Sequence, residues 1–251
     1  MPSAMAAHAS RRIEDPVIDP LRYLAQTMSA APEPRTIRFL SHDLTEQVEA
    51  FWQRYPEARA DADGVRFEAP DADAALWLPL VSPRARGGER VGDYAERLLE
   101  ADGAVDEVQV VLLLQAGAMA FGCWRGDELL QHKAVRKYVV RGNGKSQATH
   151  LKTRGKSRYG SRLRLQNWKS LLAETNERLA DCEQQFGPFA RIFHSVPVRA
   201  WSDLFEAEPR PGFARDDARL QRLGMHVHRP DHEELLRVRG RMQCGRVVTD
   251  Q

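Results

Sequence analysis

Residues 107–115 read EVQVVLLLQ, a largely apolar run that ends just before Gly117. A continuous apolar run of this length is typical of a strand that is covered on both faces of a sheet. Gly117 predicts a turn into a second strand at Ala118–Trp124, and the RGD at residues 125–127 predicts a turn into a third strand at Glu128–Val140. The sequence therefore predicts a three-stranded meander with residues 107–115 at the centre of the sheet.

Helices and further strands are expected after the meander. The longest expected helix is Tyr159–Phe186, because apolar residues recur along one of its faces. These residues are Trp168, Leu171, Leu172, Thr175, Leu179, Cys182 and Phe186. The later expected elements are a strand at Ala190–His194, a helix at Val198–Phe205, a strand at Met225–His228 and a helix at Asp231–Val238. Clustered strands followed by alternating helices and strands predict an α/β domain with a mixed β-sheet and helices on both faces.

The residues before the meander predict a separate unit. Residues 1–35 are rich in Ala, Pro and Ser and are expected to be a disordered tail. Residues 36–82 predict a small N-terminal α+β subdomain. Its expected elements are a strand at Thr36–Leu40, a helix at Leu44–Tyr55 capped by Asp43, and strands at Val65–Glu68 and Ala74–Leu80. Pro83–Glu89 (PRARGGE) is expected to be a linker to the larger domain at residues 90–245, which would open with a helix near Asp93–Glu100.

Composition limits the possible classes of protein. With 42% hydrophobic and 29% charged residues, the chain is expected to be soluble and globular. It has no apolar run long enough for a membrane span, and its first residues lack the apolar core of a secretory signal. Cys123, Cys182 and Cys244 lie far apart without a CxxC pair, which argues against a zinc site and a disulfide framework. A cytoplasmic location is therefore expected.

The charged residues are unevenly distributed. The chain has 37 Lys and Arg against 35 Asp and Glu, a net charge of only +2. Twelve of these cations and no acidic residue lie between Leu129 and Ala173, which leaves 25 cations and 35 anions, or −10, elsewhere. All six lysines fall in this basic window. A cluster of this kind predicts binding to a polyanion, and its scarcity of aromatics favours contact with RNA phosphates over reading of a DNA sequence.

The expected long helix has its charges at the wrong ends. Cations begin it at Arg158, Arg162, Arg164 and Lys169, and anions follow at Glu174, Glu177, Asp181 and Glu183. The helix dipole favours the opposite order by roughly 0.3–1 kcal/mol for each charge. We therefore expect the N-terminal end of this helix to meet a polyanion.

A loop between the third strand and this helix carries the candidate chemistry. Residues 142–157 begin GNGKSQATHLKTRGK, have no apolar periodicity and predict a mobile loop. The residues argue against a phosphate-binding P-loop, because Val139 stands where that motif needs glycine, and Gln115 stands where a magnesium site would want aspartate. Gln147 is left at an exposed tip. Its amide both donates and accepts hydrogen bonds, so it can orient a water molecule although it cannot act as a general base.

The stretch Ala120–Gln147 resembles the middle domain of the eukaryotic and archaeal peptide-release-factor superfamily. In that superfamily a strand carrying HK leads into a mobile loop with a GGQ-type motif. His132–Lys133 matches the HK pair and Ser146–Gln147 matches the tip, while Lys145 and Ser146 replace the glycines. Two later runs also match, one at Tyr159–Arg164 with Asn167, and one from Arg229–Pro230 through Glu233, Glu234 and Leu235 to Arg237–Val238. Over residues 105–240 the chain looks like a bacterial branch of the Vms-like release factors.

This resemblance implies a fold and an activity. The larger domain would be of the release-factor middle-domain, RNase H-like type. The protein would be a peptidyl-tRNA hydrolase of ribosome rescue and ribosome-associated quality control, acting on peptidyl-tRNA in stalled large ribosomal subunits. When it is not bound to the ribosome, it would be a monomer. Gln147, Ser146 and Gly144 would form the catalytic tip, and no metal, cofactor, membrane or DNA would be needed. The expected contacts to rRNA and tRNA phosphates are Lys133, Arg136, Lys137, Arg141, Lys145, Lys152, Arg154, Lys156, Arg158, Arg162 and Arg164.

Two alternatives remain open from the residues themselves. The first is a ribonuclease that cuts the acceptor end of tRNA, in which His150 of the loop would orient the nucleophile. The second is a ribosome-binding or RNA-binding module without catalysis, which uses the basic window alone.

Overall fold

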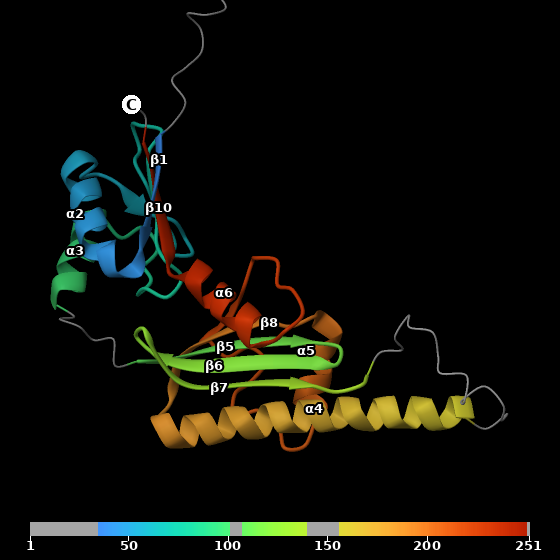
Figure 1. Cartoon of the computed structure of the whole chain (residues 1–251). Helices are drawn as coiled ribbons and strands as arrows, with labels where there is room; N and C mark the ends of the chain where they lie inside the picture. The colour runs from blue at the N-terminus through green and yellow to red at the C-terminus, as the bar shows by residue number, and fades with distance from the viewer. Residues whose placement is uncertain (1–34, 101–106, 140–155, 250–251) are drawn as a thin grey trace, which may run out of the picture.

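The computed structural model describes residues 35–100, 107–139 and 156–249, with side chains described from residue 160 onward in the last range. These residues form two five-stranded sheets (Figure 1). Sheet A has the strand order β1-β10-β4-β3-β2, and sheet B has the order β7-β6-β5-β8-β9. The expected tail and nearly all of the expected loop lie outside the described residues.

Sheet B contains the expected meander. The strands β5 (Val108–Gln115), β6 (Ala118–Arg125) and β7 (Glu128–Arg136) pair in antiparallel order. On its other side β5 pairs in parallel with β8 (Phe189–Ser195), which pairs in parallel with β9 (Leu220–Arg222). The mixed sheet and the central place of β5 are confirmed.

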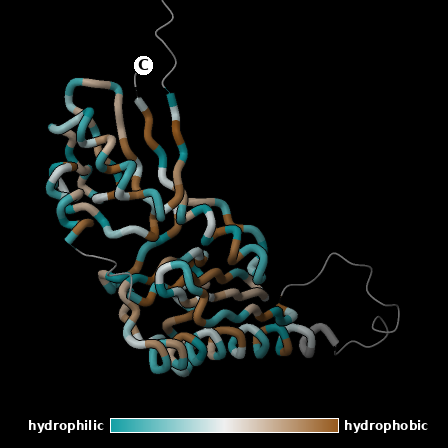
Figure 2. Tube along the Cα trace, turned by 60° about the vertical axis from the view of Figure 1, so that its left-hand side comes forward, coloured by the Kyte–Doolittle hydropathy of each residue, from teal (hydrophilic) through white to brown (hydrophobic). Residues whose placement is uncertain are grey.

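Helices cover both faces of sheet B, also as expected. The helices α4 (Lys156–Phe186) and α5 (Val198–Glu206) pack on one face, and α6 (His232–Met242) packs on the other. Alternate residues of β5 face the two sides: Val110, Leu112 and Leu114 contact the α4 side, whereas Val111 and Leu113 contact the α6 side. Figure 2 shows hydrophobic residues concentrated between these layers. Both faces of β5 are buried, which explains why its sequence shows no polar alternation.

Two predictions about this half of the chain are wrong. Met225–His228 is not a strand, and the parallel edge strand is β9 at Leu220–Arg222. The side-chain amide of Gln115 instead donates to the carbonyls of Val227 and His228 at 3.1 and 2.9 Å, so a side chain takes the place of a strand partner. The second error concerns Cys123 of β6 and Cys182 of α4, which form a disulfide, because strand and helix pack face to face in one cluster.

Sheet A is built from both ends of the described chain. Its elements are β1 (Arg35–Leu40), η1 (Ser41–Asp43), α2 (Leu44–Arg54), β2 (Arg59–Ala60), β3 (Arg66–Glu68), β4 (Ala75–Trp77), α3 (Val91–Glu100) and β10 (Cys244–Thr249). The final strand, β10, lies between β1 and β4 and is antiparallel to both. Asp43 does not cap α2 with its side chain, because its carboxylate accepts a hydrogen bond from the amide of Leu40.

Residues 83–89 are not a linker. Ala85 is buried, and its amide donates to the carbonyl of Gly64 at 3.0 Å. A Cβ at Gly64, whose φ is +66°, would lie 1.9 Å from the carbonyl oxygen of Ala85, so only glycine allows this approach. Tyr94 of α3 donates to the carbonyl of Pro83 at 2.7 Å and packs in the core beneath sheet A. The helix α3 therefore belongs with sheet A and not with the larger unit.

A half-buried arginine joins the two units. The guanidinium of Arg191 on β8 donates to the carbonyl of Leu80 at 2.8 Å and to that of Val81. The amide of Gln109 on β5 also donates to the carbonyl of Val81, at 2.9 Å. Burial lowers the pKa of Arg191 to about 10, which still leaves the group charged at neutral pH. The segment after β4 is thereby fixed against the strands of sheet B.

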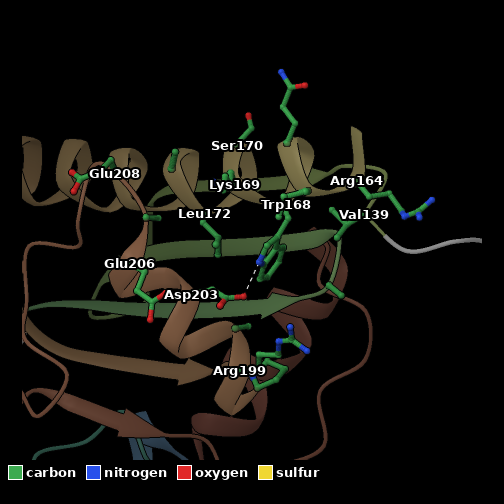
Figure 3. A pocket seen from close by; sticks show the side chains of 17 residues that line it. Val139, Arg164, Trp168, Lys169, Ser170, Leu172, Arg199, Asp203, Glu206 and Glu208 are labelled. Carbon is green, nitrogen blue, oxygen red and sulfur yellow. Dashed lines mark hydrogen bonds between the residues drawn. The ribbon is translucent and has the colours of Figure 1, made fainter. Parts of the chain in front are cut away.

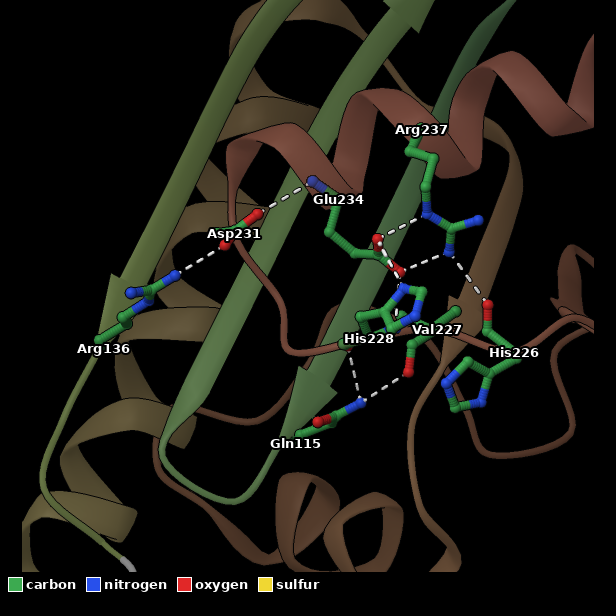
Figure 4. A network of polar contacts seen from close by, with 8 residues as sticks. All are labelled: Gln115, Arg136, His226, Val227, His228, Asp231, Glu234 and Arg237. Carbon is green, nitrogen blue, oxygen red and sulfur yellow. Dashed lines mark hydrogen bonds and ion pairs between the residues drawn. The ribbon is translucent and has the colours of Figure 1, made fainter. Parts of the chain in front are cut away.

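A second polar network anchors α6 (Figure 4). Asp231 caps the helix by accepting from the amide of Glu234 at 2.9 Å. The buried carboxylate of Glu234 accepts two bonds from Arg237, both 2.6 Å, and one from the amide of His228 at 2.6 Å. These hydrogen bonds, led by those of Arg237, outweigh the effect of burial and lower the pKa of Glu234 to about 2.

Replacing Glu234 with Gln should remove a pH-dependent part of the stability. Because the folded pKa lies below the ordinary value of 4.5, the contribution is full above about pH 4.5 and disappears as pH falls toward 2. We expect Glu234→Gln to lower the free energy of unfolding by about 1–3 kcal/mol at pH 7 and by much less near pH 3. Urea unfolding across this range measures the difference. Glu233→Gln, at an exposed carboxylate in the same turn, is the control, and a Glu234→Gln deficit that does not change with pH contradicts the assignment.

Candidate functional site

The predicted catalytic tip can be located only by the elements on either side of it. Gly144, Ser146 and Gln147 lie outside the described residues, and so do the cations Arg141, Lys145, Lys152 and Arg154. The described chain stops at Val139, just after β7, and resumes at Lys156, the first residue of α4. Lys156 and Arg158 are placed in the first turns of α4 by their backbone alone. The candidate site is therefore the base from which residues 140–155 depart.

Side chains of α4 bind the chain that leaves β7. The amide of Asn167 donates to the carbonyl of Tyr138 at 2.8 Å. The ammonium of Lys137 donates to the hydroxyl of Ser170 at 2.7 Å and pairs with the carboxylate of Glu174 at 2.9 Å. These contacts fix the end of β7 against the middle of α4.

The turn between β5 and β6 supports the same backbone from the other side. The amide of Lys137 donates to the carbonyl of Gly117 at 2.9 Å. Gly117 has a φ of +83°, and a Cβ there would lie 2.8 Å from the carbonyl oxygen of Lys137. Gly117, which marks the predicted turn after the central strand, therefore has to be glycine for β7 to pack against this turn.

The described cations of the basic window fall into two groups. Arg136 pairs with Asp231 at 2.7 Å, and Lys137 pairs with Glu174, so this chain already offsets both charges. Lys133 on β7 and Arg162 on α4 are exposed and have no carboxylate partner within the described ranges. Arg164, half-buried, donates to the hydroxyl of Ser161 at 3.2 Å. The unpaired cations are the ones free to contact an external anion.

The histidine of the HK pair has a packing role. The ring of His132 stacks on that of His232, with centroids 4.0 Å apart, and so joins β7 to the first turn of α6. Burial, followed by the neighbouring His232, lowers the pKa of His132. The neutral form is therefore favoured, and two stacked cations are avoided at neutral pH.

A groove of about 1110 Å³ runs between α4 and α5 and reaches the loop base at Val139 (Figure 3). Trp168 lies in its wall and donates from its indole nitrogen to Asp203 of α5 at 2.8 Å. Arg164 and Arg199 line the end near Val139, whereas Glu206 and Glu208 line the other end. Arg199 could not be identified from the sequence, since the pattern of its short helix shows only an apolar face.

The described geometry provides positioning. Within the described ranges, no three His, Cys, Asp or Glu side chains form a group that could hold a metal ion. No helix in the same ranges is both long and apolar enough to cross a membrane. What the structure provides is a fixed base for residues 140–155 and an adjoining helix end that carries cations.

Comparison with solved structures gives weak similarities. The chain is similar to the Vms1 mitochondrial localization core, with 12% identity, 80% of this chain and 81% of that chain covered, and a TM-score of 0.47. It is also similar to an archaeal translation termination factor, aRF1, with 13% identity, coverage of 74% and 60%, and a TM-score of 0.27. A PilM-PilN type IV pilus biogenesis complex matches with 15% identity, coverage of 76% and 65%, and a TM-score of 0.26. No curated protein matches the chain.

Comparison with family models is decisive. The model described as the Bacteroidetes VLRF1 release factor matches residues 109–250. The match covers more than half of the chain and includes the strands of sheet B except for Val108, the loop base and the three helices around that sheet. The chain belongs to the Bacteroidetes VLRF1 release factor family.

Proposed function

We propose that this protein hydrolyses the ester bond of peptidyl-tRNA on stalled large ribosomal subunits, with Gln147 at the reaction centre. The observation that carries the proposal is the family match, which spans the loop and its base. Membership of a release factor family gives the protein a role on ribosomes. The choice of peptidyl-tRNA on stalled subunits goes further and is our proposal.

The proposed reaction needs positioning more than it needs an unusual catalytic group. Hydrolysis of an ester requires a water molecule held in line with the carbonyl carbon and donors for the developing oxyanion. The amide of Gln147 offers both a donor and an acceptor to such a water. Ser146 and Gly144 would shape the tip, and neither a metal nor a cofactor is required. The ribosome would supply the remaining groups around the ester.

The fold supports delivery of the tip over a distance. The helix α4 has 31 residues, which corresponds to a rod about 46 Å long. Its N-terminal end extends beyond the strands of sheet B (Figure 1). The contacts of Asn167 and Lys137 fix the chain that enters the loop after β7 beside this helix. A tip carried on such an arm can reach a buried site while the body of the protein stays outside.

The basic window supports contact with rRNA and tRNA. Eleven cations surround the tip in the sequence: Lys133, Arg136, Lys137, Arg141, Lys145, Lys152, Arg154, Lys156, Arg158, Arg162 and Arg164. Exposed cations at the N-terminal end of a helix are unfavourable for the free protein and favourable beside phosphates. We expect Arg162 to contribute more than Arg136 or Lys137, whose charges are paired within the protein.

Removal of Gln147 tests the catalytic assignment. We expect Gln147→Ala to slow peptide release by a factor on the order of 10²–10³, typical for loss of one group that stabilises a transition state, while ribosome binding is unchanged. The assay incubates the protein with large subunits that carry labelled peptidyl-tRNA and follows both products. Gln184→Ala, at an exposed glutamine near the far end of α4, is the matched control.

The two products of this assay separate the proposed function from its alternatives. Free peptide with an intact tRNA supports ester hydrolysis. A shortened tRNA shows a ribonuclease, and binding without either product shows a non-catalytic module. Full release by Gln147→Ala contradicts the role given to that residue.

Reversal of Arg162 tests phosphate contact. Arg162→Glu should weaken ribosome binding and reduce the slope of log affinity against log salt concentration by about 1, since one phosphate contact is lost. Arg178→Glu is the control, because Arg178 is half-buried on the second half of the same helix and pairs with Asp181. Equal effects of the two reversals on the salt slope contradict a phosphate contact at Arg162.

Loss of the Asn167 amide tests the loop base. Asn167→Ala should lower the rate of peptide release at saturation by roughly tenfold, because the anchoring of the tip loosens and small misplacements are costly in catalysis. Affinity for the ribosome and the unfolding midpoint should change little, since the bond lies near the surface. Gln166→Ala changes the exposed neighbour and serves as control. A loss of affinity with an unchanged maximal rate is the opposite outcome and counts against a positioning role.

A further inference from the structure

One face of sheet A carries an arginine-rich row across four strands. The register pairs Arg38 of β1 with Arg246 of β10, Arg246 with Trp77 of β4, and Trp77 with Arg66 of β3. Residues directly opposite one another lie on the same face of a sheet. The neighbouring positions Phe39, Val247, Leu76 and Phe67 point to the other face, where α2 and α3 cover them. The row therefore occupies the face that these helices leave uncovered.

Arg38 and Arg246 are like charges held against each other. Residues paired directly across two strands have Cβ atoms about 4.5–5.5 Å apart, and like charges there are destabilising. Neither guanidinium forms an ion pair with any carboxylate that the structure describes. The guanidinium of Arg246 instead lies 4.0 Å from the centre of the Trp77 ring. Arg66, by contrast, is neutralised by Glu68 at 2.6 Å.

The row opens into a groove of about 660 Å³ between sheet A and the larger unit. Five exposed arginines line it, and they come from five separate segments: Arg38, Arg84, Arg222, Arg241 and Arg246. None of their side chains is paired with a described carboxylate. Asp63 is the one acidic residue among the lining residues. A fold that gathers unpaired cations from β1, β9, α6, β10 and the segment after β4 favours an anionic ligand that spans several of them.

We propose that this groove binds the sugar–phosphate backbone of RNA, as a second RNA-binding surface distinct from the loop. Guanidinium groups present planar pairs of donors that match phosphate oxygens, and they also stack on aromatic rings. The guanidinium groups of Arg246 and Arg66 lie over the Trp77 ring, and guanidinium planes held in this way offer RNA bases a flat surface for stacking. An acidic peptide would use the charges but has no need of the ring. The surface shares no residue with the loop base, so it can act whether or not the loop is catalytic.

Charge reversal in the groove tests the proposal. The full chain is titrated with a fluorescent oligouridine RNA at several salt concentrations. The double variant Arg38→Glu/Arg246→Glu should bind at least tenfold more weakly, with a salt slope smaller by about 1.4, since two contacts to a single strand are lost. The control variant Arg90→Glu/Arg210→Glu makes the same change in net charge at two exposed arginines outside the groove, and it should change affinity by less than twofold.

A stability measurement separates lost binding from lost structure. The single variant Arg38→Glu places opposite charges across the β1–β10 pair, so its unfolding midpoint should equal or exceed that of the wild type while RNA affinity falls. A lower midpoint that accounts for the lost binding overturns the proposal. Wild-type affinity in the double variant also overturns it. Competition by polyglutamate as strong as that by RNA overturns it in favour of an acidic protein segment.

The same variants keep this proposal separate from the proposed function. Oligouridine binding needs no ribosome and no peptide release, so it reports on the groove even if the wild type releases no peptide. Conversely, Gln147→Ala should leave the effect of the Arg38→Glu/Arg246→Glu reversal unchanged. On an RNA long enough to contact both surfaces at once, Arg162→Glu and the groove reversal should lower affinity by factors that multiply.

Discussion

The burial of β5 on both faces is the constraint on which the rest of the larger unit depends. A strand without a polar face must be covered twice, and α4 with α5 does so on one side while α6 does so on the other. Covering β5 in this way places the middle of α4 beside the end of β7. Asn167 and Lys137 can then bind the chain where it leaves the sheet. The geometry of the loop base is thus a consequence of how the core is closed.

Charge in this protein is arranged against the stability of the isolated fold in two places. Cations occupy the N-terminal end of α4, where the helix dipole disfavours them. Arg38 and Arg246 face each other across neighbouring strands. Other arginines are carefully paired, as Arg237 is with Glu234 and Arg191 is with two backbone carbonyls. The fold thus pairs these half-buried arginines and leaves the exposed ones unpaired, which is the arrangement that the two proposed RNA contacts require.

Elements with a local signal could be predicted from the sequence, and elements made by distant pairing could not. The meander and α4 follow from an apolar run, two turns and a helical period. The strand β10 could not be predicted from its own residues, because it is defined by its pairing with β1 and β4. Residues 83–89 look like a linker in the sequence, and only the contact between Gly64 and Ala85 shows that they are not. The candidate tip was found through a resemblance in motif order. Asn167 belongs to the same resemblance, but its contact with the loop base could not be predicted, because a bond to a backbone carbonyl leaves no trace in residue type.

The place of β10 in sheet A has a consequence for biosynthesis. Arg35 pairs with Thr249, so β1 can pair with β10 only after the residues up to Thr249 have been synthesised. Until β10 has emerged from the ribosome, β1 has no partner in sheet A, and the arginine row is incomplete. The strands of sheet B pair between closer segments, the last of them at Leu220–Arg222, and can pair earlier. A nascent copy would therefore pair the strands of sheet B before it had the groove, and that groove would exist only after β10 had joined sheet A.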